Sequence, residues 1–323
     1  MRVTVIGAGA IGGWLAATLA KGGAEVALVA RGATLEQIRA QGLTVLQGER
    51  RDTYRLAAAE RAQDLPKPDA VVLAVKTYAF ADAVAHASPA LSHGPLLVTA
   101  MNGLPWWFLD GLGGPLNNQR LESVDPGGKA AALLGSVQPV GAVAHVSARA
   151  ESPGIIRVAA ADRFILGEPA ANVSRETIEF SQLVNAGGAE CILSKDIRLD
   201  IWSKLWGNMN MNPVSALTRL TANGIFGEPR LFELVRDMMT EFVRVGERLG
   251  IALSIGVEQR LETTKRLGDF RTSMLNDVEA GRALEVEGLL GVVVELAEKL
   301  GESLPATRTV YALARGLNRH QTG

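Results

Sequence analysis

Cysteine is almost absent from this sequence, and other signs of a specialised class of protein are missing as well. The single cysteine, Cys191, cannot form a disulfide within the chain, which fits a reducing compartment. A formal net charge of -1 gives no basic field for nucleic acid. No apolar run reaches the roughly 18–20 residues that span a bilayer, and the N-terminus has neither a basic segment nor a cleavage signal. We therefore expect a cytoplasmic protein without a membrane or nucleic-acid partner.

The sequence also lacks the residue spacing of a metal site. Its histidines stand apart from one another, at His86, His93, His145 and His320. Cys191 belongs to no metal-ligand pattern either. We expect structural roles for all five residues and no bound metal.

What the sequence does contain is a strand-rich first half followed by a helical second half. Its 323 residues suit two domains, and 47% hydrophobic with 21% charged residues is typical of a globular protein. In the first half, runs such as "RVTVIGAG", "AEVALVARG" and "DAVVLAVK" alternate with helix-like segments, which indicates a parallel sheet covered on both faces. After "AECILS" only helical periodicity remains, over 196–212, 229–249, about 255–267, 273–299, with Gly288 as a candidate break, and 305–318.

This change of pattern predicts two domains with a boundary near residue 193. Residues 1–193 are expected to form an α/β domain of the Rossmann type, and residues 194–323 an all-α domain. The Gly/Pro-rich stretch "NGLPWWFLDGLGGPLNNQRLESVDPGGK", residues 102–129, interrupts the first domain. Long loops of this kind are usually functional or mobile.

The segment "VTVIGAGAIGG" places glycines between the first strand and the first helix. Gly7 permits a tight turn, Gly9 lets the backbone approach a pyrophosphate, and Gly12 lets helix and strand pack closely. The helix N-terminus offers free N–H groups and a partial positive charge to the phosphates. We expect cofactor contacts from Gly7, Ala8, Gly9, Ala10, Ile11 and Gly12. The alternative is a glycine-rich turn without a ligand.

The end of the second strand indicates which dinucleotide binds. An NAD enzyme usually places Asp or Glu there to hold the ribose 2′-hydroxyl. This sequence has Ala30 and Arg31 instead, and a guanidinium can grip a 2′-phosphate through paired hydrogen bonds. We predict a preference for NADPH. The alternative is that Arg31 is only a surface charge.

Two further residues follow strands of the same predicted sheet. Lys76 ends "DAVVLAVK", and Asn102 follows "PLLVTAM". Ligands in such sheets bind outside the carboxyl ends of the strands, so these two residues, Gly9 and Arg31 are expected to converge on one crevice. Taken singly, Lys76 would be a solvated lysine and Asn102 part of an ordinary turn.

The helix predicted over 196–212 carries a polar stripe. Residues four apart differ by roughly 40° around a helix, so Lys204, Asn208 and Asn212 share one face. They offer one ammonium and two amides that can donate hydrogen bonds to a bound oxygen. Pro213 is expected to end or kink the helix just beyond them. The alternative is a solvent face, and the core face would then be Trp202, Leu205, Trp206 and Met209.

Two blocks of the helical half resemble the ketopantoate reductase (2-dehydropantoate 2-reductase) family. They are "IWSKLWGNMNMNPVSALT" and "TSMLNDVEAGRALEVEGLLG", residues 201–218 and 272–291. "GAGAIG", "VKT" and "NG" match in order, so the resemblance covers nearly the whole chain. It implies a Rossmann-type N-terminal domain, a C-terminal domain similar to that of 6-phosphogluconate dehydrogenase, NADP(H) as cofactor, a 2-oxo acid substrate and pantothenate biosynthesis.

The resemblance also implies a role for each matching residue. Lys204 would be the general acid that protonates the carbonyl oxygen as hydride arrives, and Glu285 would hold the substrate's hydroxyl and orient Lys204. Lys76 would contact the cofactor or the substrate, and Asn102 would lie beside the nicotinamide. The substrate-binding residues would be Asn208, Asn212, Ser273 and Asn102, with Ser273 on the carboxylate. Desolvation in a closing cleft would lower the pKa of Lys204 toward the working range.

The spacing of Ser273 and Glu285 restricts their geometry. Twelve residues along one helix would point them about 120° apart. Both can face one small substrate if Ser273 is the N-cap, with Asp277 near the first turn. The alternatives are that Ser273 only caps the helix and that Glu285 is a surface charge.

The stretch 102–129 departs from the family pattern, which soon reaches the next strand after Asn-Gly. Trp106, Trp107 and Phe108 lie just beyond that pair. They line or cover the substrate site, or they pack against the helical half or a second subunit. The sequence therefore leaves undecided whether the substrate is ketopantoate or a bulkier 2-oxo acid.

We predict an enzyme that reduces 2-dehydropantoate (ketopantoate) to pantoate with NADPH. One rival is a related NADPH-dependent reductase of a different 2-oxo acid. The other is a non-catalytic NADP(H)-binding sensor, which needs the glycines and Arg31 but has no use for Lys204 or Glu285. The sequence leaves the oligomeric state, including a homodimer, undecided.

Overall fold

The computed structural model describes residues 1–135, 137–170 and 172–322, and its chain forms two compact units. Unit 1 contains Met1–Met101 and Gly128–Ile201, and unit 2 contains Asn102–Gly127 and Trp202–Gly323. Gly323, the last residue of the second expected domain, lies outside the described residues. The Gly/Pro-rich stretch thus groups mainly with the helical part of the chain, although the sequence pattern assigns it to the first domain.

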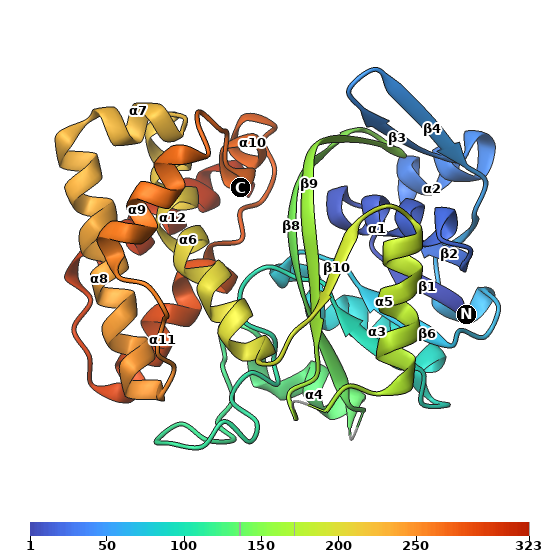
Figure 1. Ribbon diagram of the computed structural model, residues 1–323, viewed down its shortest axis with the longest axis horizontal. Helices are drawn as coiled ribbons and strands as arrows, with labels where there is room; N and C mark the ends of the chain where they lie inside the picture. Colours follow the sequence, from blue (N-terminus) through green and yellow to red (C-terminus); the bar gives the residue numbers. More distant parts are fainter. Residues whose placement is uncertain (136, 171, 323) are drawn as a thin grey trace. The chain divides into compact units, whose positions relative to one another are not determined.

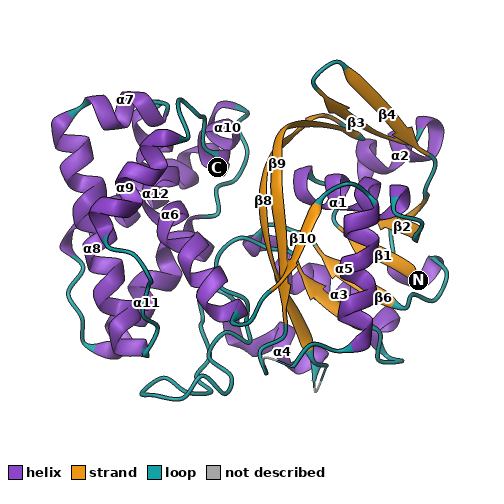
Figure 2. Ribbon diagram, viewed as in Figure 1, coloured by secondary structure: helices purple, strands orange, loops and turns teal. Residues whose placement is uncertain are grey.

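Every strand assigned in the described residues belongs to unit 1 (Figure 2). The strands are β1 Arg2–Ile6, β2 Glu25–Val29, β3 Leu43–Gln47, β4 Arg50–Tyr54, β5 Ala57–Ala59, β6 Ala70–Leu73, β7 Leu96–Thr99, β8 Pro139–Ser152, β9 Ile155–Gly167 and β10 Glu190–Leu193. They form one sheet in the order β4-β3-β9-β8-β7-β6-β1-β2-β5, and β10 pairs with β9.

The part of this sheet from β5 to β8 has the Rossmann arrangement. Its strands are all parallel, in the order β5-β2-β1-β6-β7-β8, which is the 3-2-1-4-5-6 order of dinucleotide-binding folds. The order reverses between β1 and β6, so their carboxyl ends flank the point where ligands bind. The expected α/β fold of the Rossmann type is confirmed. Two antiparallel pairs, β8 with β9 and β3 with β4, extend the sheet.

The helices of unit 1 cover this sheet and bury its Val, Leu and Ala side chains. They are α1 Ala10–Lys21, α2 Gly32–Gln41, α3 Phe80–Leu91, α4 Lys129–Leu134 and α5 Arg175–Ala186. Trp14 of α1 packs on Phe164 of β9 with ring centroids 5.9 Å apart, and Phe180 and Val184 of α5 join the same core. Short 3-10 turns occupy Ala62–Asp64, Thr77–Ala79 and Pro126–Gly128.

Unit 2 is built from helices and from the Gly/Pro-rich stretch (Figure 1). The helices are α6 Ile197–Thr218, whose first residues belong to unit 1, α7 Ala222–Gly227, α8 Pro229–Leu249, α9 Val257–Arg266, α10 Ser273–Glu279, a π-helical turn at Glu287–Gly291, α11 Val292–Leu300 and α12 Pro305–Thr322. The expected all-α C-terminal region is confirmed. None of the helices in the described ranges is long and apolar enough to cross a membrane.

Two of the expected helix boundaries differ from those in the structure. Helix α6 does not end at Pro213 but continues to Thr218, because Val214 and Ala216 beyond the proline are buried and hold the next turn in place. The segment 273–299 is not one helix: residues 280–285 are not helical, and a π-helical turn follows them.

The last helix is anchored by a carboxylate of α8. Glu241 is only 4% exposed, and its two oxygens accept the backbone N–H groups of Ala306 and Thr307, both at 2.9 Å. These N–H groups belong to the first turn of α12, where no carbonyl of the helix itself is available to them. A negative charge is favourable at that end of the helix dipole. Glu241 therefore fixes the start of α12 on α8.

Candidate functional site

The turn after β1 has room only for glycine at two positions. Gly7 has φ of +103°, and a Cβ atom there would lie 2.6 Å from the carbonyl oxygen of Ala74. A Cβ atom at Gly12 would lie 1.9 Å from the carbonyl oxygen of Gly7. Since both neighbours are backbone atoms, the turn keeps this shape only with glycine at 7 and 12.

Gly9 differs from the other two glycines because a Cβ atom there would meet nothing within 4 Å. It is the N-cap of α1 and is exposed, and Ala8, Ala10 and Ile11 around it are half-buried. The N-terminus of α1 thus faces open space at the carboxyl end of β1. This is the geometry with which helix N-termini bind phosphate groups, and the turn fits the pyrophosphate of a dinucleotide.

Arg31 and Lys76 follow the two strands that flank β1 in the sheet. Arg31 is the exposed N-cap of α2, two residues beyond β2, and its side chain has no hydrogen-bond or ion-pair partner among the described residues. Lys76 is half-buried, three residues beyond β6, and begins a 3-10 turn. Because β6, β1 and β2 are parallel neighbours, both cations lie at the same sheet edge as the glycine turn.

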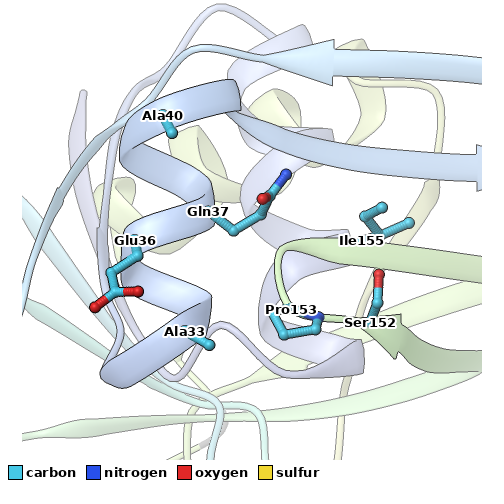
Figure 3. A pocket seen from close by; sticks show the side chains of 7 residues that line it. All are labelled: Ala33, Glu36, Gln37, Ala40, Ser152, Pro153 and Ile155. Atoms are coloured by element: carbon cyan, nitrogen blue, oxygen red, sulfur yellow. The ribbon is translucent and has the colours of Figure 1, made fainter.

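A separate cavity of unit 1, about 430 Å³ in volume, lies away from this turn between α2 and the β8–β9 connection (Figure 3). Its lining is Ala33, Glu36, Gln37, Ala40, Ser152, Pro153 and Ile155. Glu36 is the one charged residue of that lining, and a carboxylate repels phosphate groups. The cavity shares no residue with the glycine turn and is not suited to a dinucleotide.

In unit 2, α6 presents the predicted polar stripe. Lys204 and Asn208 are half-buried, and Asn212 is 6% exposed. The stripe is therefore not the solvent face that was the alternative. The opposite side of α6 is core: Trp206 is fully buried, and its Nε1 donates to the carbonyl oxygen of Met239 at 3.1 Å. In the described part of the chain, the amide of Asn208 has no hydrogen-bond partner.

Lys204 and Glu285 form the electrostatic centre of the stripe. Desolvation lowers the pKa of Lys204 to about 8, and the negative charge of Glu285 acts in the opposite direction. Glu285 is 5% exposed, so it is not the surface charge that was the alternative. An amine with a pKa near neutrality exchanges protons readily at physiological pH. This pair can therefore serve as a proton donor beside a stabilising carboxylate.

Ser273 lies next to the far end of the stripe. Asn212 donates from its amide nitrogen to the Ser273 hydroxyl at 3.4 Å. The N-cap of α10 is Thr272, whose hydroxyl accepts from the N–H of Leu275 at 3.1 Å, so the expectation that Ser273 caps this helix is wrong. Ser273 is exposed and occupies the first helical position.

The link between α10 and the π-helical turn removes the geometric conflict between Ser273 and Glu285. Because residues 280–285 leave the helix, the two side chains are not bound to a 120° offset. Within the link, Arg282 donates from Nε to the buried carboxylate of Asp277 at 3.0 Å. Its backbone N–H also bonds to the carbonyl oxygen of Asp277 at 2.9 Å. The Asp and Gly-Arg of this block thus close the turn that leads to Glu285.

The aromatic residues of the stretch 102–127 pack into unit 2. Phe108 is fully buried and stacks on Trp202 with centroids 6.0 Å apart, and Trp202 stacks on Phe242 at 4.0 Å. Trp107 is 2% exposed. Of the alternatives left by the sequence, packing against the helical half holds for Phe108. Trp106 is half-buried.

Both ends of the same stretch are fastened to the segment that follows Glu285. At the start, a Cβ atom on Gly103 would lie 2.3 Å from the carbonyl oxygen of Gly288, so these backbones touch directly after Asn102. At the other end, Glu295 of α11 accepts the N–H groups of Glu122 and Ser123, each at 2.9 Å, and the Ser123 hydroxyl at 2.7 Å. Asn102 is thereby held within unit 2.

We expect Glu295→Ala to release the end of this stretch. Hydrogen bonds to a charged group contribute about 1.5–3 kcal/mol each, so the open population should rise about tenfold or more. Trypsin cleavage after the exposed Arg120 measures it. Glu298→Ala is the matched control, because Glu298 is an exposed partner of Arg308 at 2.9 Å, and exposed ion pairs contribute little. Equal cleavage rates in the two variants would contradict the anchoring role of Glu295.

The comparisons with known proteins identify the family of this chain. Residues 3–106 match the family Ketopantoate reductase PanE/ApbA, and residues 196–318 match Ketopantoate reductase PanE/ApbA C terminal. The chain is 40% identical to a 2-dehydropantoate 2-reductase of Mesorhizobium japonicum over 319 residues, 98% of each chain. The chain belongs to the ketopantoate reductase family. It is a pyridine-nucleotide-dependent oxidoreductase of the 2-dehydropantoate 2-reductase type.

Solved structures support the same conclusion about the fold. A crystal structure from Ralstonia solanacearum MolK2, provisionally assigned as a ketopantoate reductase, has a TM-score of 0.94 at 37% identity and covers 99% of this chain and 98% of that one. A D-mandelate dehydrogenase solved with NADH and anilino(oxo)acetate has a TM-score of 0.84 at 16% identity, with full coverage of both chains. The second likeness concerns the fold alone. The resemblance to ketopantoate reductases that the sequence motifs indicate is confirmed.

Sequence motifs alone do not identify the residues that support this candidate site. No recognisable pattern marks Glu295, Glu241 or Asn318, because the groups they bind are backbone N–H groups of distant segments.

Among the described residues, no group of three or more His, Cys, Asp or Glu side chains is arranged to hold a metal. His86 and His93 contact the carbonyl oxygens of Asp82 and Pro68, both at 2.7 Å.

Proposed function

We propose that this protein reduces 2-dehydropantoate to pantoate with NADPH, and that Lys204 is the general acid. The observation that supports this most strongly is a half-buried lysine with a pKa lowered to about 8 and a buried Glu285 beside it, in a member of the ketopantoate reductase family. A sensor that only binds the nucleotide has no use for such a pair. The reductase therefore accounts for more of the structure than the sensor does.

The chemistry requires a proton at a defined atom. A nicotinamide, when bound, would supply a hydride to the keto carbon, and the keto oxygen would then carry negative charge that has to be stabilised and protonated. The ammonium of Lys204 stabilises that charge and gives up one N–H proton, which forms the hydroxyl. The neutral amine then takes a proton from water. Glu285 keeps Lys204 protonated beforehand, because its negative charge raises the pKa of the lysine.

Three polar side chains of unit 2 are suited to hold the substrate. Asn208 and Asn212 donate amide N–H groups along one face of α6, and the Ser273 hydroxyl is 3.4 Å from the Asn212 amide. We assign Ser273 to the carboxylate and the two amides to the polar oxygens of the 2-oxo acid. Glu285 accepts a hydrogen bond from a substrate hydroxyl. We also assign Asn102 to contacts with the substrate and with the nicotinamide.

The nucleotide is assigned to the glycine turn of unit 1. Gly7 to Gly12 would hold the pyrophosphate at the start of α1, and Lys76 would add a positive charge at the same sheet edge. We assign the exposed guanidinium of Arg31, which has no ion-pair partner within the described ranges, to a ribose 2′-phosphate. The D-mandelate dehydrogenase of the same fold was solved with NADH, so the fold by itself does not select NADPH.

Arg31→Ala should therefore reduce the preference for NADPH over NADH. Loss of a charge-assisted contact with phosphate costs about 1.5–3 kcal/mol, or roughly 10–100-fold in kcat/KM for NADPH, and the NADH value should stay close to that of the wild type. Steady-state kinetics with both nucleotides measures the ratio. Arg39→Ala, on the same helix, is the control. An unchanged ratio in Arg31→Ala would remove the basis for the NADPH assignment.

The pKa of Lys204 gives the reaction a pH dependence. The donor must carry its proton, so kcat/KM should be constant below about pH 8 and fall tenfold per pH unit above it. Glu285→Gln removes the charge that raises the pKa of Lys204, and the decline should begin at a lower pH. A profile that stays flat through pH 9 would contradict proton donation by this lysine.

The substrate is tested by mixing the purified protein with NADPH and a panel of 2-oxo acids. Loss of the near-ultraviolet absorbance of NADPH with 2-dehydropantoate supports the proposal. A faster reaction with a bulkier aromatic oxo acid would favour the related reductase, with half-buried Trp106 as the first residue to vary. Nucleotide binding without turnover on any member would favour the sensor. A homodimer stays a prediction, and light scattering tests it.

A further inference from the structure

Glu285 is carried by a segment that is not itself a regular helix. Residues 280–285 form a link between α10 and the π-helical turn at Glu287–Gly291. Leu284, Glu285 and Val286 are each at most 5% exposed. The end of the link is thus buried, and buried backbone groups outside a helical hydrogen-bond ladder need partners from elsewhere. The position of Glu285 therefore depends on residues outside the link.

One of these partners comes from the last turns of the chain. The side-chain oxygen of Asn318, on α12, accepts the backbone N–H of Leu284 at 2.8 Å. One turn further along α12, Gln321 donates from its amide nitrogen to the carbonyl oxygen of Val278 at 2.7 Å. These two residues thus hold both the end of α10 and the link. The side chains of Asn318 and Gln321 therefore attach the end of α12 to this region.

Helix α12 is itself held at its other end. Glu241 binds the N–H groups of Ala306 and Thr307, which fixes the start of α12 on α8. A helix is a stiff element with a rise of about 1.5 Å per residue, so fixing its first turn also fixes where its last turns lie. Asn318, which binds Leu284, therefore lies on a helix whose position is fixed by α8.

We propose that Asn318 is a positioning residue that sets the place of Glu285 through the backbone N–H of Leu284. The N–H of Leu284 belongs to the planar peptide group that precedes this residue, and only the φ and ψ bonds of Leu284 separate that group from the peptide group that carries Glu285, so the hydrogen bond restrains the backbone within two rotatable bonds of Glu285. Displacement of a positioned group by about 1 Å lowers catalytic rates by about 100-fold. The inference rests on the proposed function, because it assumes that Glu285 acts on Lys204 and the substrate.

The test compares two substitutions at residue 318 in the full-length protein. Asn318→Leu removes the acceptor, and Asn318→Asp keeps one. We expect Asn318→Leu to lower kcat by about 10–100-fold with the KM for NADPH unchanged, and Asn318→Asp to recover most of the loss. Arg319→Ala, on the same turn and exposed, is the control and should behave as the wild type.

Hydrogen–deuterium exchange supplies a readout that does not depend on activity. In Asn318→Leu, the peptide that contains Leu284 should exchange faster, and peptides of α8 should be unchanged. A kcat within about twofold of wild type despite faster exchange at Leu284 would overturn the inference. Equal losses in the Leu and Asp variants, or unchanged exchange at Leu284, would overturn it too. If the wild type reduces no 2-oxo acid, the proposed function fails first, and this inference fails with it.

Discussion

Replacing Lys204 with alanine is expected to lower kcat by about 100- to 10,000-fold, the usual contribution of a positioned general acid. The variant loses both the proton donor and the positive charge that stabilises the developing alkoxide. Nucleotide affinity should change little, because the glycine turn and Arg31 belong to a different unit of the chain. Steady-state kinetics combined with fluorescence titration of NADPH separates the two quantities.

Two further substitutions make the Lys204 experiment specific. Lys195→Ala removes an exposed lysine shortly before α6 and should retain full activity. Lys204→Arg keeps a positive charge but not a group that loses its proton near neutral pH, because the pKa of arginine is above about 12. It should remain strongly impaired. Near-normal turnover in Lys204→Ala would exclude this residue as the acid.

The second large effect is expected at the glycine turn, where two similar substitutions should fail for different reasons. Gly12→Ala places a Cβ atom 1.9 Å from the carbonyl oxygen of Gly7, and a backbone atom cannot yield as a flexible side chain does. The free energy of unfolding should fall by more than about 3 kcal/mol, the upper end of overpacking effects. Thermal or urea unfolding measures the loss.

Gly9→Ala should instead fold normally and lose the nucleotide. Gly9 has φ of −78° and ψ of −166°, which alanine adopts without strain, and its Cβ atom would meet nothing within 4 Å. That open space is where the pyrophosphate is assigned, so a methyl group should weaken NADPH binding by about 100-fold, equivalent to about 3 kcal/mol. If Gly9→Ala binds NADPH normally, the pyrophosphate is held elsewhere.

Much of the fold follows from local sequence patterns. Continuous Val and Leu runs mark β1, β2 and β6, because a strand buried on both faces has no polar side. The antiparallel partner β4, with the sequence RRDTY, gives no such signal, since its pairing with β3 depends on a neighbour rather than on its own side chains. The break lies at 280–285, where Gly281 has φ of +65°, rather than near Gly288, and the sequence conceals it because Ala, Leu and Glu in that segment are themselves good helix formers.

The candidate site, like the fold, can be predicted from the sequence only in part. Periodicity alone places Lys204, Asn208 and Asn212 on one face of α6, since the helical repeat fixes that relation. The contact between Asn212 and Ser273 joins segments 61 residues apart, and only the family resemblance suggests it in advance. The supports of Glu285 and of the Gly/Pro-rich stretch are side chains bound to backbone groups, and any sequence provides such N–H groups. No pattern of residue types can predict those contacts.

The lone thiol has a practical consequence for measuring the opening of the Gly/Pro-rich stretch. Cys191, in β10, is half-buried, and desolvation raises its pKa to about 12. Since only the thiolate reacts with maleimides and haloacetamides, the native protein should label about a thousand times more slowly than one with an ordinary exposed cysteine. A fluorophore can therefore be attached to a cysteine introduced at Asn117, on the exposed part of the Gly/Pro-rich stretch, without first removing the native sulfur.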